Sequence, residues 1–172
     1  MRPLIAIVLA FLVVAAAAPA SAETDDGPKL IFKKNTVFHL LSPDAKIAVY
    51  GLDDPDVQGI ACHFALPEQG GWKGWLGLAE QVSDASLACR QTGPIHFKAK
   101  FDQGEVVFRK RRSLFFKKVQ IVRGCDKERN VLVYLIYTDK LIDGSPKNSV
   151  STVAIMPWGA QAAVEKCADF VE

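Results

Sequence analysis

The sequence predicts a mainly β (α+β) fold in which antiparallel strands form a sandwich or a partly open barrel. Three observations indicate this class. Short segments rich in Val, Ile, Phe and Tyr recur along the chain, separated by turn residues such as Gly, Pro, Asp and Asn. Four cysteines suit a small exported domain with disulfide bonds. Helical patterns are confined to one short helix near 76–83 and a C-terminal helix near 160–171.

The amino terminus has the pattern of a secretory signal peptide. Arg2 precedes an uncharged apolar run over 4–18, and Pro19 ends the run. Ala20-Ser21-Ala22 has the small-x-small form of a cleavage site, so we expect cleavage after Ala22. The run is shorter than the roughly 20 apolar residues that cross a bilayer. We therefore expect residues 1–22 to be removed and the mature chain to have no transmembrane span.

The remaining residues, 23–172, are expected to form a single domain, since about 150 residues suffice for one hydrophobic core. The full chain has 21 basic and 19 acidic residues. Cleavage removes Arg2 and no acidic residue, which leaves a formal charge of +1. This near balance argues against a nucleic-acid-binding protein, because such proteins depend on a strongly positive surface.

In the first half of the mature chain, residues 23–29 are expected to form a loose start. Alternating apolar residues predict five strands, over 36–41, 46–52, 57–66, 85–91 and 95–101. Asp53-Asp54-Pro55-Asp56 is a strong turn signal, because proline fixes φ and aspartate side chains accept hydrogen bonds from nearby amides. Gly93-Pro94 is expected to end the fourth of these strands.

In the second half, strands are expected over 105–109, 114–123, 131–137 and 150–156. Short polar turns between them favour antiparallel hairpins. The run over 131–137 is apolar on both faces and predicts a central strand that is covered on both sides. The C-terminal helix is predicted by an apolar stripe at three- and four-residue steps. Its members are Ala160, Ala163, Val164, Cys167, Ala168 and Val171.

Strand parity selects among the three possible pairings of the four cysteines. Cys62 shares a face with apolar neighbours of its strand, and Cys89 does the same in its own strand. The two can therefore meet inside the domain, which favours Cys62–Cys89 and leaves Cys125–Cys167. No Cys-x-x-Cys and no Cys/His zinc spacing occurs, so structural disulfides are favoured over redox or metal chemistry.

Many segments between residues 32 and 158, in order, resemble the CreA family. They include Asp53-Asp54-Pro55-Asp56-Val57, Gly74-Trp75-Leu76-Gly77-Leu78-Ala79-Glu80, Cys89-Arg90-Gln91, Gly104-Glu105-Val106-Val107-Phe108, Gly144-Ser145-Pro146-Lys147-Asn148 and Met156-Pro157-Trp158. The resemblance implies a periplasmic protein and carries over no activity and no catalytic residue. Cys125 and the segment after Trp158, which contains Cys167, extend beyond the familiar pattern.

Two segments are candidate binding sites. The glycine-rich stretch 70–77 carries Trp72, Lys73 and Trp75. It is a candidate because glycines let a ligand approach the backbone and because tryptophans stack on sugars or lie at lipid interfaces. The alternative is a loop whose tryptophans cap the core. The basic run with Arg109, Arg111 and Arg112 could contact anionic envelope polymers, and the alternative is a solvated hairpin tip.

An enzyme would need carboxylates, and Asp54, Asp56, Glu80 and Asp84 are the candidates. Signatures of hydrolases, zinc proteases and nucleotide-binding loops are absent from the sequence. His39, His63 and His96 fall on the polar side of their strands and are expected to be exposed rather than metal ligands. No metal or other cofactor is expected.

These observations favour an exported, non-catalytic domain that binds an envelope component or another periplasmic protein. The alternative is a periplasmic enzyme that acts on a small molecule through the four carboxylates.

Overall fold

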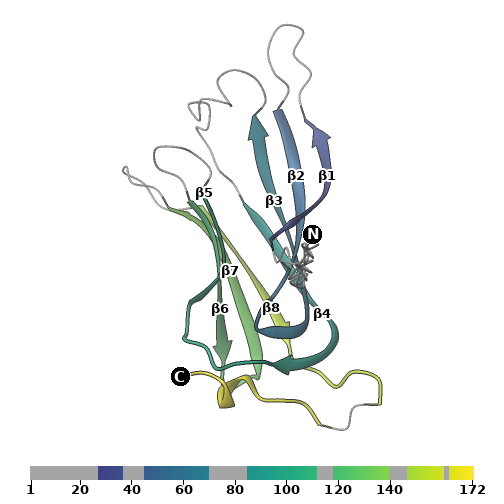
Figure 1. The fold of residues 1–172 in the computed structure, drawn as a ribbon, viewed down its shortest axis with the longest axis vertical. Coiled ribbons are helices and arrows are strands. Elements are labelled where there is room, and N and C mark those ends of the chain that lie inside the picture. Colours follow the sequence, from purple (N-terminus) through teal and green to yellow (C-terminus); the bar gives the residue numbers. More distant parts are fainter. Residues whose placement is uncertain (1–26, 37–44, 70–84, 112–117, 140–146, 161–162) are drawn as a thin grey trace, which may run out of the picture.

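The computed structural model describes residues 27–36, 45–69, 85–111, 118–139, 147–160 and 163–172. These residues form two antiparallel four-stranded sheets, in the orders β1-β2-β3-β4 and β5-β6-β7-β8, which lie side by side (Figure 1). The mainly β sandwich is therefore confirmed, and the described strands do not close into a barrel. The strands are β1 (Lys29–Asn35), β2 (Ala45–Asp53), β3 (Val57–Gln69), β4 (Ser86–Phe97), β5 (Glu105–Arg111), β6 (Lys118–Asp126), β7 (Val131–Asp139) and β8 (Asn148–Ala154).

The first sheet buries one face. Ile60, Cys62, Phe64 and Leu66 of β3 are buried, and β4 alternates in the same way. This period of two places the apolar side chains in the core between the sheets and the intervening residues outside. The edge strand β1 is exposed along its whole length and lies earlier than the strand expected over 36–41, most of which lies outside the described residues.

The prediction that Gly93-Pro94 ends a strand is wrong, because β4 continues to Phe97. The pairing partner of Gln58 is His96, whereas that of Ile60 is Gln91, so a bulge absorbs the Gly-Pro pair. Gly59 makes this bulge possible: its φ is 78°, and a Cβ there would lie 2.2 Å from the Pro94 carbonyl oxygen.

In the second sheet, β7 lies between β6 and β8, as expected of a central strand. Leu132, Tyr134 and Ile136 are fully buried on one face. The residues on the other face of β7 are half-buried. The predicted central strand is therefore fully covered on one face and partly covered on the other. β-Branched and aromatic residues suit this position because they pack well on a pleated surface.

The two sheets also meet along β4 and β8, where side chains supply the hydrogen bonds. Ser151 Oγ accepts from the Cys89 backbone N–H at 2.8 Å. The side-chain amide of Gln91 both donates to the Met156 carbonyl at 2.8 Å and accepts from the Met156 N–H at 3.0 Å. The bond to Ser151 satisfies the buried Cys89 N–H, which would be costly to leave without a partner, and the two bonds of Gln91 join the strands at the exposed end of the junction.

The predicted C-terminal helix over 160–171 is wrong. Among the described residues, this segment contains one 3₁₀ turn, Cys167–Asp169, and crosses one end of both sheets (Figure 1). Asn130 bonds the Cys167 N–H and the Glu165 carbonyl, and Phe101 exchanges backbone hydrogen bonds with Phe170 and Glu172. Tertiary contacts thus take the backbone groups that a helix would use. The helix predicted near 76–83 lies outside the described residues.

Candidate functional site

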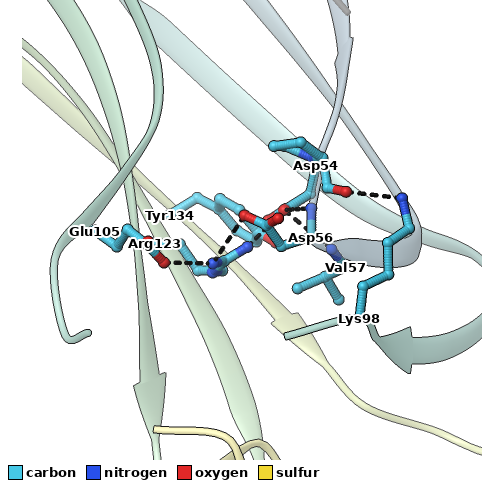
Figure 2. Close-up of polar contacts among 8 residues, drawn as sticks. Asp54, Asp56, Val57, Lys98, Glu105, Arg123 and Tyr134 are labelled. Carbon is cyan, nitrogen blue, oxygen red and sulfur yellow. Dashed lines mark hydrogen bonds and ion pairs between the residues drawn. The ribbon is translucent and has the colours of Figure 1, made fainter. Parts of the chain in front are cut away.

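A buried arginine connects the two sheets. Arg123 extends from β6 toward the turn between β2 and β3, and its side chain has no exposed surface (Figure 2). One terminal nitrogen lies 2.5 Å from Asp54 Oδ1, and the other lies 2.8 Å from Glu105 Oε2 and 3.5 Å from Asp56 Oδ2. The Phe101 ring lies 4.3 Å from the guanidinium carbon. The arginine is thus paired with charge and stacked on an aromatic ring.

The Asp54 carboxylate receives four donors. Oδ1 accepts from the backbone N–H groups of Asp56 and Val57, at 2.9 and 3.1 Å, and from Arg123. Oδ2 accepts from the Tyr134 hydroxyl at 2.7 Å. The first two bonds confirm the predicted aspartate-stabilised turn. A carboxylate held in this way anchors the turn to the second sheet and has no free oxygen for proton transfer.

Two members of the network, Arg123 and Tyr134, have raised pKa values. Burial alone would lower the pKa of Arg123, but the adjacent Asp54 carboxylate outweighs it and raises that pKa above its ordinary value. Burial, followed by the negative charge of Asp54, raises the pKa of Tyr134 far above 10.0. Among buried side-chain nitrogens and oxygens of the described residues, Arg123 Nε alone has no hydrogen-bond partner.

Sequence reasoning missed this network, although a signal was present. Val119, Ile121 and Arg123 alternate along β6, and all three are fully buried. An arginine on the apolar side of a strand predicts a buried charge that needs partners. Which carboxylates meet it depends on the docking of the two sheets, and strand parity does not specify that.

Both predicted disulfides are present. Cys62 and Cys89 pair directly across β3 and β4 and join these neighbouring strands. Cys125, in β6, joins Cys167 of the C-terminal segment. Parity thus identified the correct pairing, and no described cysteine is free.

The other predicted site residues are not brought together by the described structure. Trp72, Lys73, Trp75 and Arg112 lie outside the described residues, as do Glu80 and Asp84. Arg109 is exposed, and its Nε donates to Gln120 Oε1 at 2.9 Å. Arg111 ends β5, and its side chain is outside the description.

His63 and His96 are exposed, as predicted, while His39 lies outside the described residues. His96 Nδ1 lies 2.7 Å from Glu165 Oε1. No group of three or more His, Cys, Asp or Glu residues in the described ranges could hold a metal ion. No helix in the described part of the chain has the length and apolar character of a membrane span.

A hollow of about 350 Å³ lies beside the turn that Asp54 anchors. Its lining includes Lys29, Gly51, Asp53, His63 and Lys98. The hollow lies on the outer side of the first sheet, because Gly51 and His63 alternate with the core residues of β2 and β3. Sequence analysis did not identify it, since its residues come from four separate segments.

The comparisons with known proteins agree with the sequence resemblance. The model of a family described as "CreA protein" matches residues 31–158. Protein CreA of Escherichia coli strain K12 and its counterpart in strain O157:H7 are each 51% identical over 128 residues, which covers 72% of this chain and 82% of theirs. No solved structure matches. The C-terminal segment after Trp158, with Cys167, lies beyond the family match. The chain is therefore a member of the CreA family.

Proposed function

We propose that this protein is an exported periplasmic domain, 23–172, which binds an envelope component or another periplasmic protein and catalyses no reaction. Export rests on the signal-like residues 1–22 and is supported by the two disulfides, because disulfides persist in oxidising compartments. Cell fractionation with amino-terminal sequencing tests this step. We expect a periplasmic protein that begins at Glu23, and a cytosolic full-length chain with reduced cysteines would contradict it.

The non-catalytic character rests chiefly on the Asp54 carboxylate. Its four donors occupy both oxygens, and its side chain has no exposed surface. Asp56, the second carboxylate of the enzyme alternative, lies beside the same arginine. A general acid or base must reach the proton that it transfers, and the buried Asp54 cannot do so. Asp56 is 43% exposed and therefore stays among the candidates of the enzyme alternative. Glu80 and Asp84 keep the enzyme alternative open to experiment.

The contacts with the partner are assigned to the sequence candidates, namely Trp72, Lys73, Trp75, Arg109, Arg111 and Arg112. Tryptophans and arginines are the side chains most enriched at the energetic centres of interfaces. An exposed basic run would also attract anionic envelope polymers.

A pull-down from envelope extract tests this assignment. We expect Trp75→Ala to fold normally and to lose the partner that the wild-type protein captures. Trp158→Ala is the matched control, because Trp158 is exposed (45%) and is the last residue of the family match, far from Trp75 in the sequence. If Trp75→Ala retains all partners, or if both variants lose them equally, the glycine-rich stretch is not the binding site.

A further inference from the structure

Gly51 lies in the lining of the hollow beside the β2–β3 turn. A Cβ at Gly51 would lie 3.2 Å from Ile31 Cδ1 and 3.8 Å from His63 Cδ2, so the Ile31 side chain packs closely against the glycine and would have to shift for a larger residue. The register of β1 shifts between Leu30 and Phe32, which brings Ile31 over Gly51.

The rim of the hollow is mainly basic. Lys29 and Lys98 contribute two ammonium groups, and His63 contributes an imidazole. Lys98 is held in place, because its Nζ donates to the Pro55 carbonyl oxygen at 2.7 Å. Among the described residues of the lining, Asp53 is the one exposed carboxylate, since Asp54 is buried and paired with Arg123. The exposed formal charges therefore favour an anion.

We propose that this hollow binds a small soluble molecule through an oxyanion, either a phosphate or a carboxylate group. The volume of about 350 Å³ falls in the range of small-molecule sites. The described residues of the lining include no arginine, so recognition by these residues relies on point charges rather than on a planar fork. The described lining includes none of the tryptophan and arginine candidates, so this proposal and the proposed function are tested independently.

The test is a titration of the full mature protein, followed by its ¹H–¹⁵N NMR spectrum. The probes are inorganic phosphate, glycerol 3-phosphate and succinate, with glycerol as the uncharged control. We expect at least one anion to shift the amides of Gly51, Ala61 and His63 saturably, with a Kd of about 1 mM or tighter. The probe that binds best identifies the oxyanion. Absence of saturation by any anion up to about 10 mM would overturn the proposal.

Variants then show whether the charges are responsible. Lys29→Met should weaken binding about fivefold, because one ammonium near 4 Å contributes that factor even in water. Lys98→Met should do the same, but it also removes the bond to Pro55, so Lys29→Met is the cleaner variant. Lys127→Met is the matched control, because Lys127 is exposed in the β6–β7 turn of the other sheet.

Two further variants act in opposite directions. Gly51→Ala should weaken binding severalfold, because its Cβ would displace the Ile31 side chain that lines the hollow, and Asp53→Asn should strengthen binding by removing a like charge. A purely structural role of these residues predicts no gain of affinity for Asp53→Asn. If Lys29→Met and Lys127→Met bind the anion equally well, the proposed site is wrong.

Discussion

Asp54 and Glu165 are carboxylates with similar partners in different surroundings. Asp54 accepts two backbone N–H groups and Glu165 accepts one, and each also contacts a side chain from a distant part of the chain. The Asp54 side chain is completely buried and pairs with a buried arginine, whereas Glu165 is 31% exposed and meets the exposed His96. The same chemistry should therefore stabilise the protein strongly at the first site and weakly at the second, because solvent screens the second.

The largest expected effect is the loss of the buried charge partner. Arg123→Met leaves Asp54 buried without its counter-charge, which should lower the free energy of unfolding by about 3–5 kcal/mol. Urea denaturation of the oxidised protein measures this change. Arg129→Met is the control, because Arg129 forms an exposed ion pair with Asp126 in the same sheet and its loss should change unfolding little. Equal effects of the two variants would remove the distinction between the regions.

A smaller effect is expected from removing the Tyr134 hydroxyl, which donates a hydrogen bond to Asp54. Tyr134→Phe removes one hydrogen bond to a buried carboxylate and should cost about 1.5–3 kcal/mol. The raised pKa of Tyr134 also predicts a pH dependence. The native phenol stays protonated while the unfolded one ionises, so wild-type stability should fall as the pH rises through 10.0.

Thermal unfolding between pH 7 and pH 11 checks this dependence. Tyr134→Phe should show a weaker alkaline decline than the wild type, because its phenyl ring does not titrate. If both proteins decline in parallel, Tyr134 does not donate to Asp54 in solution.

The smallest effect is expected at the exposed site. Burial alone would raise the pKa of Glu165, but hydrogen bonds from the Phe97 N–H and from His96 lower it below 4.5. The carboxylate therefore contributes stability above pH 4.5 and loses it as the pH falls through the lower native pKa. Glu165→Gln should cost up to about 1 kcal/mol at pH 7, with a gap to wild type that narrows in acid.

Glu172→Gln is the control for that measurement, because Glu172 lies in the same segment and only reaches Lys100 at 4.0 Å. Its effect should be negligible at every pH. If the difference in unfolding free energy between Glu165→Gln and the wild type stays constant from pH 7 to acid, the Glu165 charge does not stabilise the C-terminal segment.

The contrast between the two carboxylates also explains how far the sequence predicts this molecule. Alternation along β3 and β4 identified the buried faces, and it correctly paired Cys62 with Cys89. The turn at Asp53–Asp56 was equally local, because its bonds run between neighbours in the chain. Features that depend on period-two patterning or on one turn were therefore predictable.

Features that depend on the docking of distant segments were not. The apolar stripe over 160–171 matched a helix, but the contacts with Asn130, Phe101 and Cys125 override that propensity. Arg123 and the hollow at Gly51 likewise require strands from separate parts of the chain. The candidate tryptophans and Arg112 lie outside the described residues, and the side chain of Arg111 is outside the description, so those assignments stay predictions.

A double-mutant cycle on Asp54→Asn and Arg123→Met tests most directly whether this carboxylate serves to hold the two sheets together. The unfolding free energies of wild type, both single variants and the double variant give the coupling energy. We predict a coupling of about 1.5–3 kcal/mol, because each single variant strands a buried partner that the double variant removes. Additivity within about 0.5 kcal/mol would contradict the account.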